Sequence, residues 1–147
     1  MFVPSMLLKQ LYTFGSLENT DQGVQFVIKN RLADATFTGL LDVKIDGTSV
    51  ANDQLRLHMG NGEAYTPDEI SAEQPIDFPL RRTVSIVAGI DPLDKGKHEI
   101  EVVFRSDPFG ELNLKVEDAI TEEELDLTRI PRDEADDYSE AIIQERQ

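Results

Sequence analysis

The sequence contains no cysteine and no tryptophan, and only two histidines, His58 and His98. Without cysteine the chain has neither disulfides nor a thiolate-ligated metal site. No apolar run approaches the roughly 20 residues that span a bilayer. The opening segment, residues 1–11, is too short and too proline-interrupted to be a secretory signal. These absences lead us to expect a cytoplasmic protein that does not enter a membrane.

Basic residues are also scarce, with 14 Lys and Arg against 29 Asp and Glu and a net charge of −15. Such a surface repels the phosphates of nucleic acids and anionic lipids, so neither is an expected partner. Residues 119–147 hold ten acids and three bases, a net charge of −7. The acidity is equally typical of a cytoplasm at high salt and of an ordinary acidic protein.

Alternation of apolar and polar residues is the dominant pattern and predicts strands with one buried face. Six such stretches are clear, and turn residues such as Asp46-Gly47 and Lys95-Gly96 separate them. They cover residues 24–28, 41–45, 55–59, 84–88, 99–105 and 112–117. We expect a seventh strand in Met6–Phe14, where Leu8, Tyr12 and Phe14 share a face, and an eighth around Ile76–Leu80.

Strands at this spacing, each with one apolar face, predict two sheets packed face to face. The fold class is therefore an all-β antiparallel β-sandwich of about seven or eight strands. We expect Phe26, Val43, Ile86, Val102 and Leu114 in its core. Thr66-Pro67-Asp68-Glu69 has the pattern of a capping box and predicts one short helical turn near residues 67–71.

The domain organisation follows from a change in composition after Asp118. Residues 1–118 form the predicted sandwich, and residues 119–147 form an acidic C-terminal extension. This extension contains large apolar side chains, which a purely solvating tail does not need. We expect it either to be disordered or to dock on the sandwich, on a second copy or on a partner. The candidate docking residues are Leu125, Leu127, Tyr138 and Ile142.

Catalytic and metal-binding patterns are weak throughout. His58 lies on the polar face of a predicted strand and His98 follows a turn, so nothing in the sequence brings them together. Pairs such as Glu99 and Glu101 lie on an exposed strand face, where no burial raises a carboxyl pKa. We assign no catalytic, cofactor or metal residue to this chain and expect that it is not an enzyme by itself.

Three stretches, taken in order, carry a resemblance to a known family. They are Val43-Lys44-Ile45-Asp46-Gly47, Tyr65-Thr66-Pro67-Asp68-Glu69-Ile70 and Asp91-Pro92-Leu93-Asp94-Lys95-Gly96-Lys97-His98-Glu99-Ile100-Glu101-Val102. Together they resemble the small β subunit of bacterial C-glycoside deglycosidases over residues 7–118. The opening of the chain, Leu11–Thr20, departs from that family's pattern.

The resemblance implies an accessory subunit in carbohydrate metabolism. Its partner would be a larger TIM-barrel subunit of the sugar-isomerase type, which would hold a divalent metal and the acid/base residues. No catalytic residue carries over to this chain. The alternatives are a free-standing binding module or homo-oligomer without an enzyme partner and, least favoured by the sequence, an enzyme in its own right.

Overall fold

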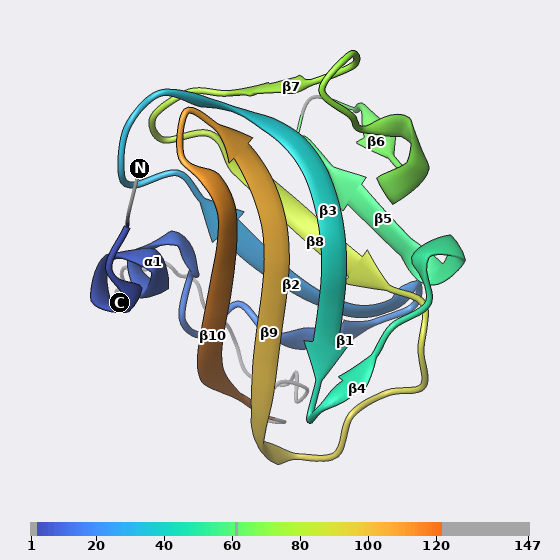
Figure 1. Cartoon of the computed structure of the whole chain (residues 1–147). Coiled ribbons are helices and arrows are strands. Elements are labelled where there is room, and N and C mark those ends of the chain that lie inside the picture. Colours follow the sequence, from blue (N-terminus) through green and yellow to red (C-terminus); the bar gives the residue numbers. More distant parts are fainter. Residues whose placement is uncertain (1–2, 61, 122–147) are drawn as a thin grey trace, which may run out of the picture.

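The computed structural model describes residues 3–60 and 62–121, and they form an antiparallel β-sandwich, as the sequence predicts. Two five-stranded sheets pack face to face, with the long strands β3, β9 and β10 in front of the other sheet in Figure 1. The first sheet has the order β1 (Glu18–Thr20), β2 (Gly23–Lys29), β8 (Thr83–Ala88), β5 (Leu55–His58) and β6 (Ala64–Tyr65). The second has the order β10 (Gly110–Ile120), β9 (Gly96–Asp107), β3 (Ala35–Ile45) and β4 (Thr48–Ser49), while β7 (Ile76–Phe78) also pairs with β3.

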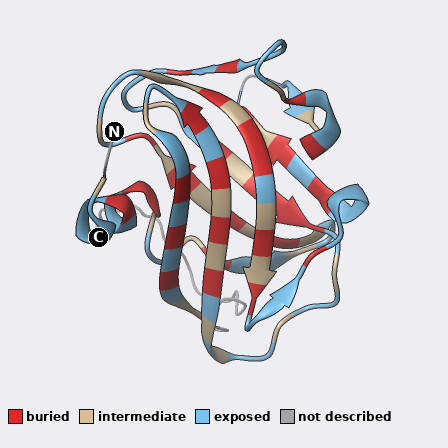
Figure 2. Cartoon of the chain, viewed as in Figure 1, coloured by how far each residue is buried: buried red, intermediate tan, exposed pale blue. Residues whose placement is uncertain are grey.

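The predicted core is confirmed. The side chains of Phe26, Val43, Ile86, Val102 and Leu114 are all at most 2% exposed. Figure 2 shows the underlying alternation as bands of buried and less buried residues along the front strands. Burial of these faces, at roughly 25 cal/mol per Å² of apolar surface, is the main force that holds the sheets together.

Leu41 begins the predicted strand 41–45, whose alternation places it on the buried face with Val43 and Ile45, and that expectation is wrong. Leu41 is 38% exposed, whereas its neighbour Leu40 is 5% exposed. The pairing of β3 with β9 shifts register between Leu40 and Asp42, so Leu41 has no partner residue and points away from the core. A β-bulge of this kind inserts one residue into a strand and reverses the faces locally.

The predicted strand at Met6–Phe14 is also wrong. That segment instead forms the short helix α1 (Ser5–Leu8) and the 3₁₀ turn η1 (Lys9–Leu11), and only Tyr12 forms an isolated bridge, to Ile28. Leu8 and Leu11 stand three residues apart, so helical turns bury both of them. The expected strand around Ile76–Leu80 is confirmed as β7, and the short strands β1, β4 and β6 complete the set.

The capping box at Thr66 is present, and its Glu69 carboxylate accepts a 2.8 Å hydrogen bond from the Thr66 N–H. It begins the 3₁₀ turn η3 (Pro67–Glu69), shorter than the helical turn expected at residues 67–71. The other 3₁₀ turn is η2 (Asn52–Gln54). Within residues 3–60 and 62–121 no helix has the length and apolar character needed to cross a bilayer.

The last strand extends beyond the domain boundary expected at Asp118. β10 continues to Ile120, which pairs with Gly96 and is 5% exposed. Residues 119 and 120 are therefore part of the second sheet.

Candidate docking surface

The first candidate feature is the segment that closes one end of the sandwich, α1 with η1. The Pro4 carbonyl accepts hydrogen bonds from the N–H groups of Leu7 and Leu8, at 3.0 and 3.1 Å. Pro4 is extended and has no N–H of its own to satisfy, which suits the start of a helix. The segment packs against β10 and buries Leu8, while Met6 remains 76% exposed. It therefore presents one face to the core and one to solvent.

Beyond η1 the chain exposes an aromatic side chain that is nevertheless held in place. Phe14 is 59% exposed, and its ring meets the ring of Tyr12 edge to face, with centroids 5.2 Å apart. Tyr12 is only 1% exposed and packs in turn against Phe26. A hollow opens beside Phe14, and we call its lining the Phe14 surface: Lys9, Gln10, Tyr12, Thr13, Phe14 and Arg31.

Arg31 holds the backbone of residues 10–13 in place with three hydrogen bonds. Its guanidinium donates hydrogen bonds to the carbonyl oxygens of Gln10 (2.7 Å) and Tyr12 (3.2 Å) and to Thr13 Oγ1 (3.1 Å). Within the described part of the chain, no carboxylate forms an ion pair with Arg31 or with Lys9. The Phe14 surface thus combines one apolar ring with two positive charges.

Asp118, on β10, holds the backbone that follows Phe14 and the side chain of Tyr12 before it. The Asp118 carboxylate accepts hydrogen bonds from the Tyr12 O–H at 2.8 Å, the Gly15 N–H at 3.0 Å and the Leu17 N–H at 3.3 Å. Burial, and then this hydrogen bond, raise the pKa of the Tyr12 phenol far above its ordinary value. Tyr12 is therefore a neutral donor at any physiological pH.

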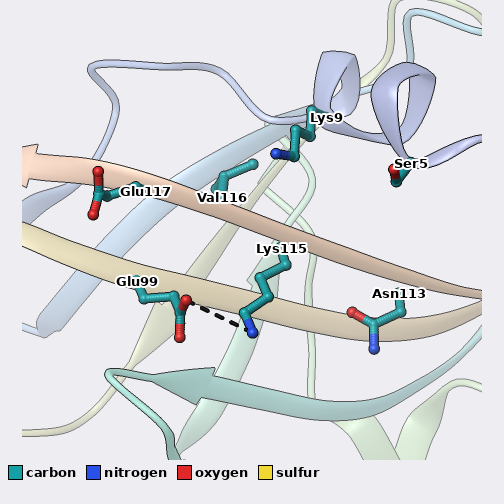
Figure 3. Close-up of a pocket in the computed structure, with 7 residues that line it drawn as sticks. All are labelled: Ser5, Lys9, Glu99, Asn113, Lys115, Val116 and Glu117. Atoms are coloured by element: carbon teal, nitrogen blue, oxygen red, sulfur yellow. Dashed lines mark ion pairs between the residues drawn. The ribbon is translucent and has the colours of Figure 1, made fainter.

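A second hollow lies on the other side of Lys9, between α1 and the outer faces of β9 and β10. Figure 3 shows the side chain of Lys9 pointing towards Val116, with Ser5 on the neighbouring helical turn and the charged side chains of β9 and β10 along the two strands. There Lys115 and Glu99 form an ion pair at 3.7 Å, and Glu117 adds a second carboxylate. The two lysines of this second hollow, Lys9 and Lys115, are balanced by Glu99 and Glu117. Of the two hollows, only the Phe14 surface therefore has a net positive charge.

The two histidines are not brought together, because His58 lies on β5 in the first sheet and His98 on β9 in the second. His98 instead links two turns. Its Nδ1 lies 2.6 Å from Asp46 Oδ2, and its Nε2 lies 2.7 Å from the Asp94 carbonyl oxygen.

Both neighbours of the His98 ring are acceptors, which favours the doubly protonated imidazolium. The bond to Asp46, followed by the bond to Asp94, raises the pKa of His98, and the same pairing lowers the pKa of Asp46. His98 therefore has a structural role. Among the described residues no cluster of three or more His, Asp or Glu has the arrangement of a metal site.

The predicted docking residues Leu125, Leu127, Tyr138 and Ile142 lie outside the described residues. Sequence reasoning missed Lys9 and Phe14 as residues of a surface because it assigned Met6–Phe14 to a strand. It missed Arg31 because only the fold brings that residue to Gln10 and Tyr12. A signal was present: Pro4 precedes Leu8 and Leu11, and their three-residue spacing is helical.

The family model for the N-terminal domain of hydroxymethylglutaryl-CoA reductase matches residues 7–121. No curated protein gives a match. The family match overturns the resemblance to the C-glycoside deglycosidase β subunit, and with it the role in carbohydrate metabolism and the support for a TIM-barrel partner.

The structure explains why that resemblance misled. Asp46 begins a turn with a positive φ of 52° and binds His98, while Thr66 begins the η3 capping box. Gly96, with a φ of 120°, starts β9. The shared motifs are thus turn and capping chemistry that sandwiches of unrelated function also need.

The match spans the sandwich from α1 to the end of β10 and includes every residue of the Phe14 surface. The chain belongs to the hydroxymethylglutaryl-CoA reductase N-terminal domain family.

Proposed function

We propose that this chain serves as a non-catalytic domain of a hydroxymethylglutaryl-CoA reductase and contacts the catalytic part of that enzyme through the Phe14 surface. The family match over residues 7–121 is the observation that carries the proposal. The family match supports the choice of the reductase as partner, and the sandwich carries the surface that would contact it.

The side chains of the Phe14 surface support the choice of contact. Centres of protein interfaces are enriched in aromatic residues and arginine, and a few such residues supply most of the binding energy. Phe14 and Arg31 are both exposed and adjacent to the same hollow. An exposed phenylalanine gains apolar burial on binding, and Arg31 offers a charge to an acidic group at the rim.

The rigidity of the surface supports it further. Association orders side chains and loops at an energetic cost, and a surface that is already ordered avoids part of it. Asp118 holds the backbone at Gly15 and Leu17, and Arg31 holds it at Gln10 and Tyr12. Phe14 is thereby presented on a loop that is fixed at both ends.

The test mixes the purified chain with the catalytic part of the hydroxymethylglutaryl-CoA reductase from the same organism. We expect the two to elute together in gel filtration, and we expect the chain alone to show no turnover of hydroxymethylglutaryl-CoA. Phe14→Ser should weaken the complex about tenfold, equivalent to ~1.4 kcal/mol.

Leu80→Ser is the matched control, because Leu80 is 45% exposed but does not line the Phe14 surface. It should leave the affinity unchanged. Separate elution at micromolar concentrations, equal loss in both variants, or turnover by the isolated chain would each contradict the proposal. A chain that elutes alone as a dimer, with Phe14→Ser restoring the monomer, would assign the surface to self-association instead.

A further inference from the structure

We propose that residues 122–147 of this same chain occupy the Phe14 surface when no reductase is bound. The segment would then compete with the reductase for one surface. That regulatory consequence rests on the proposed function, whereas the intramolecular contact itself does not.

The last strand, β10, ends close to the loop that carries Phe14. Asp118 lies three residues before Thr121, where the described part ends, and its carboxylate binds the N–H groups of Gly15 and Leu17. The chain therefore leaves β10 beside the loop that carries Phe14. A residue of extended chain covers roughly 3.3 Å, so a few of the 26 following residues suffice to reach the hollow.

The segment of residues 122–147 and the Phe14 surface have opposite charges. Residues 122–147 hold ten acids and three bases, a net charge of −7, and the rest of the chain carries −8. Most of the body therefore repels the segment. The Phe14 surface attracts it, because its lining contributes the positive charges of Lys9 and Arg31. The adjacent Asp118 carboxylate is bound by the Tyr12 hydroxyl and the Gly15 N–H, and the net charge of the three side chains remains positive.

The segment of residues 122–147 also contains large apolar side chains. Leu125, Leu127, Tyr138 and Ile142 are four of the large apolar side chains among its acids. A segment whose only task is solvation has little need for them. Phe14, 59% exposed and flanked by cations, offers the apolar contact that such an acidic and apolar segment would use.

The covalent connection strengthens a weak contact. A ligand joined by a short linker has an effective concentration in the millimolar range. An interaction between the segment and the Phe14 surface is therefore populated within the chain even when the same peptide would bind only weakly in trans.

The absence of cysteine makes a direct test possible in the full chain. Ser139→Cys places a unique attachment point for a nitroxide spin label between Tyr138 and Ile142. The measurement is the paramagnetic broadening of amide resonances in the ¹⁵N-labelled full chain, with the reduced label as reference. We expect the amides of Lys9, Thr13, Phe14 and Arg31 to lose at least half of their intensity, and those of Arg56 and Val87, on the outer face of the first sheet, to be unaffected.

Charge reversal provides the matched pair of variants. Lys9→Glu, which leaves the hydrogen bonds of Arg31 in place, should reduce the broadening at Phe14 at least twofold, whereas Lys95→Glu, a reversal away from the hollow, should preserve it. Broadening that is absent, uniform or centred on Val87 would overturn the proposal. So would broadening in a mixture of spin-labelled ¹⁴N chain and unlabelled ¹⁵N chain, because it would show contact with a second copy.

These results separate the two proposals. Broadening confined to the Phe14 surface supports the intramolecular contact even when no reductase binds. A complex with the reductase in the absence of broadening supports the proposed function and overturns the inference.

Discussion

Tyr12 and Asp118 stand 106 positions apart in the sequence, yet the Tyr12 hydroxyl donates a 2.8 Å hydrogen bond to the Asp118 carboxylate. The contact joins the segment before the first strand to the end of the last one. It holds the segment around Tyr12 against the C-terminal end of β10. The position of Phe14 depends on this hydrogen bond, because Phe14 lies between Tyr12 and Gly15, which Asp118 also binds.

Replacement of Asp118 tests this anchor. Asp118→Ala leaves the buried Tyr12 hydroxyl without its acceptor and removes the acceptor of the Gly15 and Leu17 N–H groups. A lost partner of a buried polar group costs about 1–3 kcal/mol, so the free energy of unfolding in urea should fall by that amount. Glu117→Ala, which removes only an exposed 4.0 Å contact with Lys97, should cost less than ~1 kcal/mol. Equal stability of the two variants would contradict the anchor.

Truncation of the core has a larger expected effect. Phe26 is fully buried, and its ring packs against Tyr12. Phe26→Ala removes that burial and leaves a cavity, so the free energy of unfolding should decrease by roughly 3–5 kcal/mol. Phe14→Ala, at a side chain that is 59% exposed, is the control and should cost much less. Chemical denaturation of both variants provides the comparison.

The stability should depend on pH through His98. Because its pKa is raised in the folded chain, His98 stabilises the fold fully below its unfolded pKa of about 6.5, and this contribution is lost as the pH rises through the folded pKa. Asp46 has a lowered pKa, so its contribution is lost as the pH falls through that lower value. The difference in unfolding free energy between the wild type and His98→Gln should be largest between about pH 4 and 6.5 and shrink above that range.

Melting curves of both proteins measured from pH 4 to 9 would show this trend. His58→Gln, which removes a histidine on β5 in the other sheet, is the control. A His98→Gln difference that grows above pH 7 would contradict the predicted sign.

The glycine at the start of β2 leaves no room for a side chain. Gly23 has a φ of 132°, and a Cβ added there would overlap the carbonyl oxygen of Ala88. Gly47 also has a positive φ, 83°, but open space surrounds its Cβ position. Gly23→Ala should therefore destabilise the chain by about 1–3 kcal/mol more than Gly47→Ala, the added cost of overpacking. Thermal unfolding of the two variants is the measurement, and equal losses would refute it.

The strands could be predicted because each contains its own local pattern. Val24, Phe26 and Ile28 occupy every second position of one stretch, with the polar Gln25 and Lys29 on the other face. The segment before them could not be read in the same way. Tyr12 and Phe14 stand two residues apart, as in a strand, whereas Leu8 and Leu11 stand three apart, as in the helical turns that pack against β10. The two patterns overlap in one short segment, and the sequence prediction followed the first.

The Phe14 surface could not be predicted from local sequence patterns, because it too is formed by tertiary contacts. It depends on two contacts between residues that are distant in the sequence. Asp118 binds the Gly15 N–H, and Arg31 binds the carbonyl oxygen of Gln10. The exposure of Leu41 likewise depends on register with β9, which alternation alone does not specify.

The two register shifts in β3 have a consequence for the length of the chain. Thr38 and Leu41 are the residues without a partner in β9, one in each shift. If both were deleted, Phe37, Leu40 and Val43 would still face inwards, with Gly39 and Asp42 between them facing out. Loss of one residue at either position should straighten the strand locally without forcing the sheet to re-register. These two positions are therefore where this sandwich can lose a single residue by deletion while its interior stays the same.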